Sequence, residues 1–400
     1  MDGGNTWSNH NVGLAITTFY YGALHPTNPN FALAGSQDNG TEMWQGSNSW
    51  QWVYSGDGAD TGISPTRPGT NWAVSSQQLD INRTVDGGVT YTDATAGLVK
   101  TNAPFIASFR ISPSNEDIVI TGTTNLWKCT NFFSGTTPTW FFNGPTTSAR
   151  IRGTALSAMA FAPSDGAANT YVFANSAGEL RLTTDGGSTW SDIRDPAVLP
   201  GRYVTALAFH PTNASILYVT YSGFNEGTPA HPGHVFTTVN ALAATPVWSR
   251  ITTPVNLPHN SFAIDPTDPN TVYAGTDLGI WRSRNAGNLW TRMGPETGLP
   301  NVAVYDIKIN ANGRVVAFTN GRSAFALVTE AQRRLNIAPN GPNVIVSWPA
   351  LAVNLVLQSA SQLSGTGAWI TADGTPTLVG NQYYVTNSAA GAGFYRLKSQ

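Results

Sequence analysis

The stretch DGGSTW at residues 185–190 decides the fold, because close copies of it recur along the chain. The copies read DGGNTW at 2–7, DGGVTY at 86–91 and, in a divergent form, NAGNLW at 285–290. Glycine tolerates positive φ in such a turn, and the aspartate accepts backbone N–H groups within it. A turn that recurs at this spacing indicates a fold built from repeated β units.

A second repeat runs in step with these Asp turns. It is a short apolar strand that ends at a proline turn, and the proline-free INANG at 309–313 is its seventh copy. The spacing of 39 to 55 residues between successive prolines is typical of one four-stranded propeller blade. The six prolines are Pro26, Pro65, Pro113, Pro163, Pro211 and Pro266.

Together the two repeats predict an all-β chain with two domains. Residues 1–332 are expected to form a seven-bladed β-propeller, in which residues 1–11 supply the turn and fourth strand that the last blade lacks. Residues 333–400 alternate polar and apolar positions without the repeat, which predicts a small Ig-like or fibronectin-like β-sandwich.

The Asp turns resemble the Asp-box, or BNR repeat, of sialidases, of the xyloglucanase family of glycoside hydrolases and of sortilin-type receptors. The resemblance covers residues 1–328 and implies a propeller, but it discriminates poorly between functions. VSWPA at 346–350 and FYRLK at 394–398 resemble the short β modules that end many secreted proteins of Verrucomicrobia-like and Planctomycetes-like bacteria. That resemblance implies export to an extracellular, cell-surface or periplasmic location.

The composition narrows the classes of partner. Charged residues make up 11% of the chain and the net charge is −2, without a basic run, which argues against a nucleic-acid partner. No apolar stretch is long enough to span a membrane. Cys129 is the only cysteine, so an internal disulfide is excluded, and a buried strand position is expected for it.

The strand order predicts where a site would lie. Strands alternate in direction within a blade, so the proline turns and the Asp turns share one face. The turns between second and third strands share the other face with the connections between blades, and propeller ligands usually bind there. The Asp turns are therefore structural, and the expected site lies on the opposite face, called the connection face below.

Three acidic residues on the connection face are the catalytic candidates. Asp38 lies in GSQDNG at 35–40, and Asp57 and Asp60 lie in SGDGADTG at 55–62. A glycosidase needs two carboxylates, one as acid and one as base or nucleophile. The alternative is that each aspartate accepts hydrogen bonds from its own backbone turn.

Further residues are candidates for substrate binding. Trp44 and Trp72 offer rings for stacking on sugars. Arg152, Arg202 and Arg322 are candidates for holding an anion. No resident cofactor is expected, and the histidine spacing predicts no metal site, although Asp57 and Asp60 are weak candidate calcium ligands. The remaining candidates on the connection face are Arg152, Arg202, Tyr203, Glu226, His259, Asp277 and Arg322.

Two functions remain open on this evidence. The first is an exported glycan-active enzyme, a glycoside hydrolase that uses the carboxylate pair. The second is a non-catalytic propeller module that binds a glycan or a protein, as in an extracellular matrix. Carboxylates about 5–10 Å apart in an open cleft favour hydrolysis, whereas carboxylates turned into backbone turns favour binding.

Overall fold

The computed structural model describes residues 3–8, 16–47, 49–146, 154–294, 297, 299–327, 335–349, 355–363, 369–379, 382–389 and 393–399. The chain divides into two compact units. The first comprises Met1–Arg292 and Asn301–Phe325, and the second comprises Met293–Pro300 and Ala326–Gln400. The boundary predicted at residues 332 and 333 lies outside the described residues.

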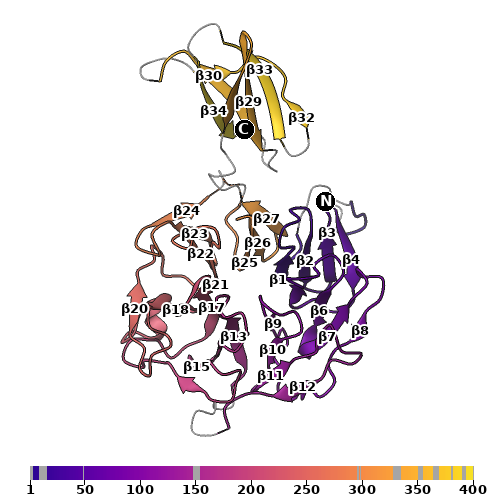
Figure 1. Cartoon of the computed structure of the whole chain (residues 1–400), viewed down its shortest axis with the longest axis vertical. Helices are drawn as coiled ribbons and strands as arrows, with labels where there is room; N and C mark the ends of the chain where they lie inside the picture. Colours follow the sequence, from indigo (N-terminus) through magenta and orange to yellow (C-terminus); the bar gives the residue numbers. More distant parts are fainter. Residues whose placement is uncertain are drawn as a thin grey trace. The chain divides into compact units, whose positions relative to one another are not determined.

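The described part of the chain is all-β, as the sequence predicts. Its only helical elements are two short 3-10 turns, Gln77–Leu79 and Asn225–Gly227. Up to Leu327, the described strands form seven antiparallel sheets in chain order, six of four strands and one of three. In the first unit these sheets follow one another around a central axis (Figure 1).

The sheets differ in length but share one order, in which each strand pairs with the next. The first three are β1(Phe19–Leu24) to β4(Trp50–Tyr54), with β2(Ala32–Ser36) and β3(Gly40–Trp44); β5(Thr61–Ile63), β6(Trp72–Ser76), β7(Asp80–Thr84) and β8(Thr92–Asp93); and β9(Phe109–Ile111), β10(Val119–Gly122), β11(Leu126–Cys129) and β12(Trp140–Phe142). The next two are β13(Leu156–Phe161), β14(Tyr171–Asn175), β15(Leu180–Thr183) and β16(Ser191–Asp192); and β17(Val204–His210), β18(Asn213–Tyr221), β19(Val235–Thr238) and β20(Trp248–Ile251). The last two are β21(His259–Ile264), β22(Val272–Thr276), β23(Gly279–Ser283) and β24(Trp290–Met293); and β25(Val304–Ile309), β26(Val315–Thr319) and β27(Ala324–Leu327).

The first strand of each sheet lies innermost and contacts the first strand of the next sheet. The ring closes where β1 contacts β25 and β26. At this seam the backbone N–H of Gly22 donates to Asp306 Oδ2 at 3.1 Å, and Arg314 donates to the carbonyl of Pro29. These two hydrogen bonds therefore join the first and last sheets, whose residues are far apart in sequence.

The first Asp turn keeps the backbone of the other copies. Gly3 and Gly4 have φ of 72° and 90°, and Gly186 and Gly187 have 76° and 99°. The described residues 3–8 nevertheless contain no strand, and Trp7 is 90% exposed. The closure of the last sheet by residues 1–11 thus stays a prediction.

Most of the core lies between neighbouring sheets. Six of the seven second strands are buried along their whole length, as in Ala32–Ser36 and Val272–Thr276, and β18 is buried in its second half. Aromatic residues of the fourth strands reach back to the preceding sheet, since Trp140 Nε1 donates to Ala94 O and Trp248 Nε1 to Ile193 O. Cys129 is fully buried at the end of β11, as expected.

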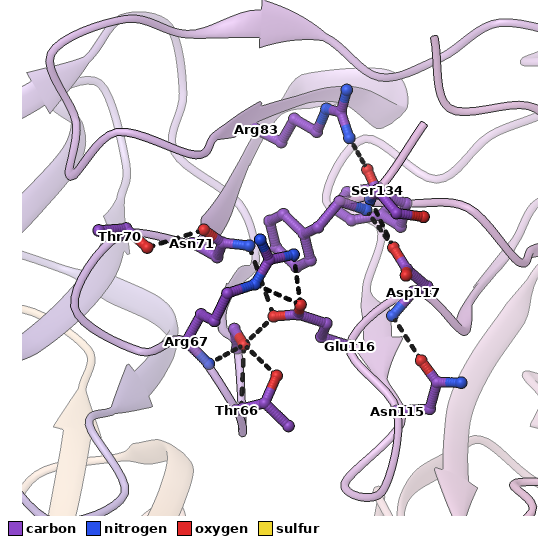
Figure 2. Close-up of polar contacts among 12 residues, drawn as sticks. Thr66, Arg67, Thr70, Asn71, Arg83, Asn115, Glu116, Asp117 and Ser134 are labelled. Carbon is purple, nitrogen blue, oxygen red and sulfur yellow. Dashed lines mark hydrogen bonds and ion pairs between the residues drawn. The ribbon is translucent and has the colours of Figure 1, made fainter. Parts of the chain in front are cut away.

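A polar cluster joins the second and third sheets on the face of the proline turns (Figure 2). Its centre is Glu116, whose side chain is 10% exposed and forms an ion pair with Arg67 at 2.5 Å. Ser64 donates to the same carboxylate, and Arg67 Nε donates to Glu116 Oε1 at 2.6 Å. These side chains, called the Glu116 cluster below, hold the two neighbouring proline turns together.

The second unit contains two antiparallel sheets. The first consists of β28(Asn336–Asn340), β29(Asn343–Pro349), β33(Gln382–Ser388) and β32(Thr377–Val379). The other consists of β31(Ile370–Thr371), β30(Leu355–Ala360) and β34(Phe394–Ser399). Trp348 and Val385 of the first sheet pack with Leu357 of the other in one buried cluster.

Candidate functional site

A repeated irregularity in the innermost strands shapes the central axis. In five of these strands one residue is skipped in the pairing with the second strand, which is the mark of a β-bulge. The extra residue lies near the start of each strand, where the chain arrives from the preceding sheet. The five bulge residues are Tyr20, Ser157, Thr205, Asn260 and Tyr305.

All five bulge residues line one pocket of about 290 Å³, called the axial pocket below. Its other lining residues include Tyr21 and Tyr203, so four tyrosines surround it. Tyr20 and Tyr305 are stacked, with ring planes 4° apart and centroids at 6.2 Å. The pocket lies at the strand ends that carry the connections between sheets, which is the connection face.

Two ion pairs lie below the tyrosines. A second cavity of about 90 Å³ shares Tyr21, Thr205, Asn260 and Tyr305 with the axial pocket. It continues to Arg110 and Lys308. Arg110 pairs with Asp60 at 2.5 Å, and Lys308 pairs with Asp306 at 2.9 Å. The floor of the site therefore carries two cations and two anions.

Asp60 is part of this floor and has a structural set of partners. It is 1% exposed, its Oδ2 accepts the Phe109 N–H at 3.1 Å, and its Oδ1 accepts the Thr61 N–H at 2.9 Å. Burial raises its pKa, while the cations of Arg110 and Lys308 oppose that rise. This carboxylate bridges the second and third sheets instead of facing an open cleft.

Asp38 and Asp57 come together at the edge of the axial pocket. Asp57 Oδ1 accepts the backbone N–H of Asp38 at 3.0 Å, and Asp38 has φ of 60° in its turn. A hydrogen bond and the negative charge of Asp57 raise the pKa of the Asp38 carboxyl. Burial, followed by the charges of these aspartates, also raises the pKa of Tyr20, so the pair lies beside the tyrosines.

Two other candidates adjoin the same pocket. Tyr203 lines it directly and is 48% exposed. Asp277 Oδ1 accepts from Asn260 Nδ2 at 3.0 Å, which ties this carboxylate to a bulge residue. Its charge also contributes, after burial, to the raised pKa of Tyr305.

Arg202 holds the long loop 222–233 in place. Its guanidinium donates to Phe224 O and Thr228 Oγ1, both at 2.8 Å, and to Gly233 O. Glu226 lies in this loop, and both of its carboxylate oxygens accept from Asn256, at 3.1 and 3.0 Å. These two candidates thus order the loop beside the pocket.

The other described candidates do not line the axial pocket. His259 is fully buried and stacks on His234 at 4.7 Å, and Arg322 donates to its neighbour Gly321 O at 2.8 Å. Trp44 ends β3 on the opposite face, under Arg314. Trp72 is 3% exposed and packs on Phe31 and Tyr91, so its ring has no free side for a sugar. Arg152 lies outside the described residues.

The sequence reasoning missed the bulge residues, which line most of the site. A signal was present, because Tyr20, Thr205 and Asn260 each stand six residues before a repeat proline, at 26, 211 and 266.

Among the described residues no group of three or more His, Cys, Asp or Glu side chains is arranged to hold a metal ion. No described helix is long and apolar enough to cross a membrane.

Comparison with known proteins identifies the fold. No protein-family model and no curated protein sequence matches the chain. Among solved structures, YCF48 from Cyanidioschyzon merolae is similar over 79% of this chain and 97% of its own, with TM-score 0.58 and 14% identity. The neighbours are β-propellers.

Two of these neighbours are GH74 enzymes. The GH74 xyloglucanase from Xanthomonas campestris is similar over 84% of this chain, with TM-score 0.57 and 12% identity. An ancestral GH74 enzyme is similar over the same share, with TM-score 0.57 and 14% identity. The chain matches only 58% and 52% of those two proteins, and at such identities the likeness concerns the fold alone.

Proposed function

We propose that this protein binds a glycan in the axial pocket without cleaving it. The observation that carries the proposal is the set of four tyrosines that line the pocket, two of them at β-bulges, because aromatic side chains offer flat apolar faces with a polar edge. Such faces suit sugar rings, which combine apolar C–H faces with hydroxyl groups. The pocket volume of about 290 Å³ lies at the lower end of the size range of ligand sites.

The three candidate carboxylates support binding over hydrolysis. Asp60 is buried in an ion pair, and Asp57 accepts the backbone N–H of the Asp38 turn. Glycosidases keep their carboxyl groups at least about 5 Å apart, because the scissile bond must lie between them. The carboxyl groups of Asp38 and Asp57 are within hydrogen-bonding reach of each other, which is closer than the spacing that glycosidases use.

The test is a panel of plant, algal and bacterial glycans, with calorimetric affinity and released reducing ends measured in parallel. We expect binding without new reducing ends. We expect at least a tenfold loss of affinity, about 1.4 kcal/mol, in Tyr203→Ala and Tyr305→Ala. Tyr384→Ala, on β33 of the second unit, is the matched control and should bind as the wild type does. Failure of every glycan to bind would overturn the proposal.

A glycoside hydrolase is the second candidate, favoured by the raised pKa of Asp38 beside Asp57. A carboxyl that keeps its proton can serve as a general acid. The same panel decides between the two, because a hydrolase would release reducing ends and lose that activity in Asp57→Asn. The GH74 likeness supports a glycan as ligand for either candidate.

We further propose that the propeller has seven blades of the Asp-box type and that residues 1–11 complete the last one. The seven sheets of the described residues and the paired positive φ angles at Gly3 and Gly4 support this reading. Deletion of residues 1–11 should then lower the melting temperature, and an unchanged value would contradict this closure of the last blade.

The low charge content and the second unit fit a protein that works outside the cytoplasm.

A further inference from the structure

We infer that the axial pocket selects glycans that carry free, protonated amino groups, such as unsubstituted glucosamine chains. This inference rests on the proposed function and names the ligand class of the same site. It follows from three features of the pocket: carboxylates at its rim, aromatic faces on its wall, and unpaired hydroxyl groups below them.

The rim of the pocket is acidic. The turn of Asp38, which is bonded to Asp57, lies at the start of β1, because the Gln37 N–H donates to Thr18 O at 3.0 Å. Asp277 is held at Asn260 by a hydrogen bond of 3.0 Å. Among the described residues, Arg202 and Arg322 are cations of the connection face. The Arg202 guanidinium donates to carbonyls of loop 222–233, and that of Arg322 donates to Gly321 O. A protonated amine that enters the pocket therefore meets carboxylates that are open to solvent.

The floor does not cancel this charge. Arg110 and Lys308 are each matched by a carboxylate, Asp60 at 2.5 Å and Asp306 at 2.9 Å. Because the two pairs are together neutral, the acidic groups of the rim decide the sign of the charge that a ligand meets.

The wall of the pocket also favours a cation. An aromatic ring attracts a positive charge placed over its face. The site itself already contains such a contact, since the Arg110 guanidinium lies 5.8 Å from the centre of the Tyr21 ring. Tyr20, Tyr203 and Tyr305 line the same pocket nearer its rim.

The pocket also contains hydroxyl groups that lack partners. Ser261 is 4% exposed and lines the deeper cavity, and its Oγ has no hydrogen-bond partner among the described residues. Ser157 Oγ, at a bulge position in the axial pocket, is buried and unpartnered in the same sense. An unpaired buried polar group is costly, so these hydroxyls are suited to bonding the N–H and O–H groups of a ligand.

The experiment compares three tetramers with the same β-1,4 linkage, made of glucose, of N-acetylglucosamine and of glucosamine. Affinity is measured by calorimetry on the full chain in mildly acidic buffer, at low and at high salt. We expect the glucosamine tetramer to bind at least tenfold more tightly than the other two, with the difference shrinking at high salt.

Variants identify the groups responsible. Asp277→Asn combined with Asp57→Asn should reduce the preference for glucosamine, measured as the ratio of its affinity to that of the glucose tetramer, several-fold. Asp268→Asn, in the proline turn on the opposite face, is the matched control and should keep the full preference. A preference retained in the double variant would overturn the assignment.

The other outcomes separate this inference from the proposed function. Equal binding of the three tetramers, or tighter binding of a neutral one, overturns the inference and leaves glycan binding intact. The same holds if none of the tetramers binds but another neutral or acidic glycan of the panel does. If no glycan binds at all, both fail.

Discussion

At the scale of single residues, the Asp turns show why each residue type recurs. In the copy at 185–190, Asp185 Oδ1 accepts the Thr189 N–H at 2.9 Å and the Thr183 hydroxyl at 2.7 Å, and Oδ2 accepts the Thr189 hydroxyl at 2.6 Å. These bonds, led by the Thr189 hydroxyl, lower the pKa of Asp185 to about 2. Their contribution to stability is therefore present above the ordinary carboxyl pKa and is lost as the pH falls toward 2.

The divergent copy at 285–290 gives a test of this reading. Asn285 Oδ1 still accepts from Ser283 Oγ and the Leu289 N–H, both at 2.8 Å, but Leu289 has no hydroxyl for a third bond. Asn285→Asp combined with Leu289→Thr should restore that bond and raise the free energy of unfolding by about 0.5–1.5 kcal/mol. Urea unfolding measures it, with Leu289→Ser and Asn285→Asp alone as controls. No gain in the double variant would contradict the account.

A histidine stack predicts sensitivity to acid. His259 donates from Nδ1 to Leu257 O at 2.8 Å, stacks on His234, and has a pKa lowered to about 3, chiefly by burial. The unfolded chain binds this proton near pH 6.5 and the folded chain does not, so stability present above pH 6.5 is lost as the pH falls toward 3. The urea midpoint should fall over this range, and less so in His259→Gln. His210→Gln, at the end of β17, is the control and should leave the slope unchanged. Equal slopes in all three proteins would refute the assignment.

At the scale of elements, the Glu116 cluster joins two sheets that have no shared hydrogen-bonded strands (Figure 2). Glu116→Ala leaves Arg67 and Ser64 without their common acceptor. We expect a loss of about 2 kcal/mol in the free energy of unfolding, since Arg67 is half exposed and water replaces part of the interaction. Asp373→Ala in the second unit is the control. A Glu116→Ala variant as stable as that control would show that the Glu116 cluster does not stabilise the contact between the two sheets. Glycan binding on the opposite face should be unaffected.

The elements also show how far sequence reasoning reaches. The strand repeats were readable because burial on both sides leaves runs such as Val272–Thr276 without charged positions. The connection face was readable because strand direction alternates. The bulges were not, since Tyr305 and Thr205 have no shared residue type and only their distance from the proline turn marks them. The environment of Asp60 could not be predicted from its Gly-rich segment SGDGADTG. A contact with Arg110, fifty residues away in sequence, decides that environment.

At the scale of the whole molecule, the first unit depends on the seam between its first and last sheets. Gly22 on β1 faces Phe318 on β26, and a Cβ at Gly22 would lie 2.0 Å from the Phe318 ring. Gly22→Ala should therefore destabilise the fold by roughly 1–3 kcal/mol through overpacking. Gly166→Ala is the matched control, because a Cβ there meets nothing within 4 Å. Thermal unfolding of both variants measures the difference, and equal melting temperatures would show that the seam yields without cost.

The β-bulges have a consequence for the diversity that this scaffold can support. Each bulge residue is excess to the hydrogen-bond ladder, and its side chain projects into the axial pocket without belonging to the cores between the sheets. Substitutions there change the ligand that fits while the framework keeps its pairing and packing. The bulge residues around the axis are therefore positions that can be exchanged separately, so single substitutions there can give the scaffold a new ligand.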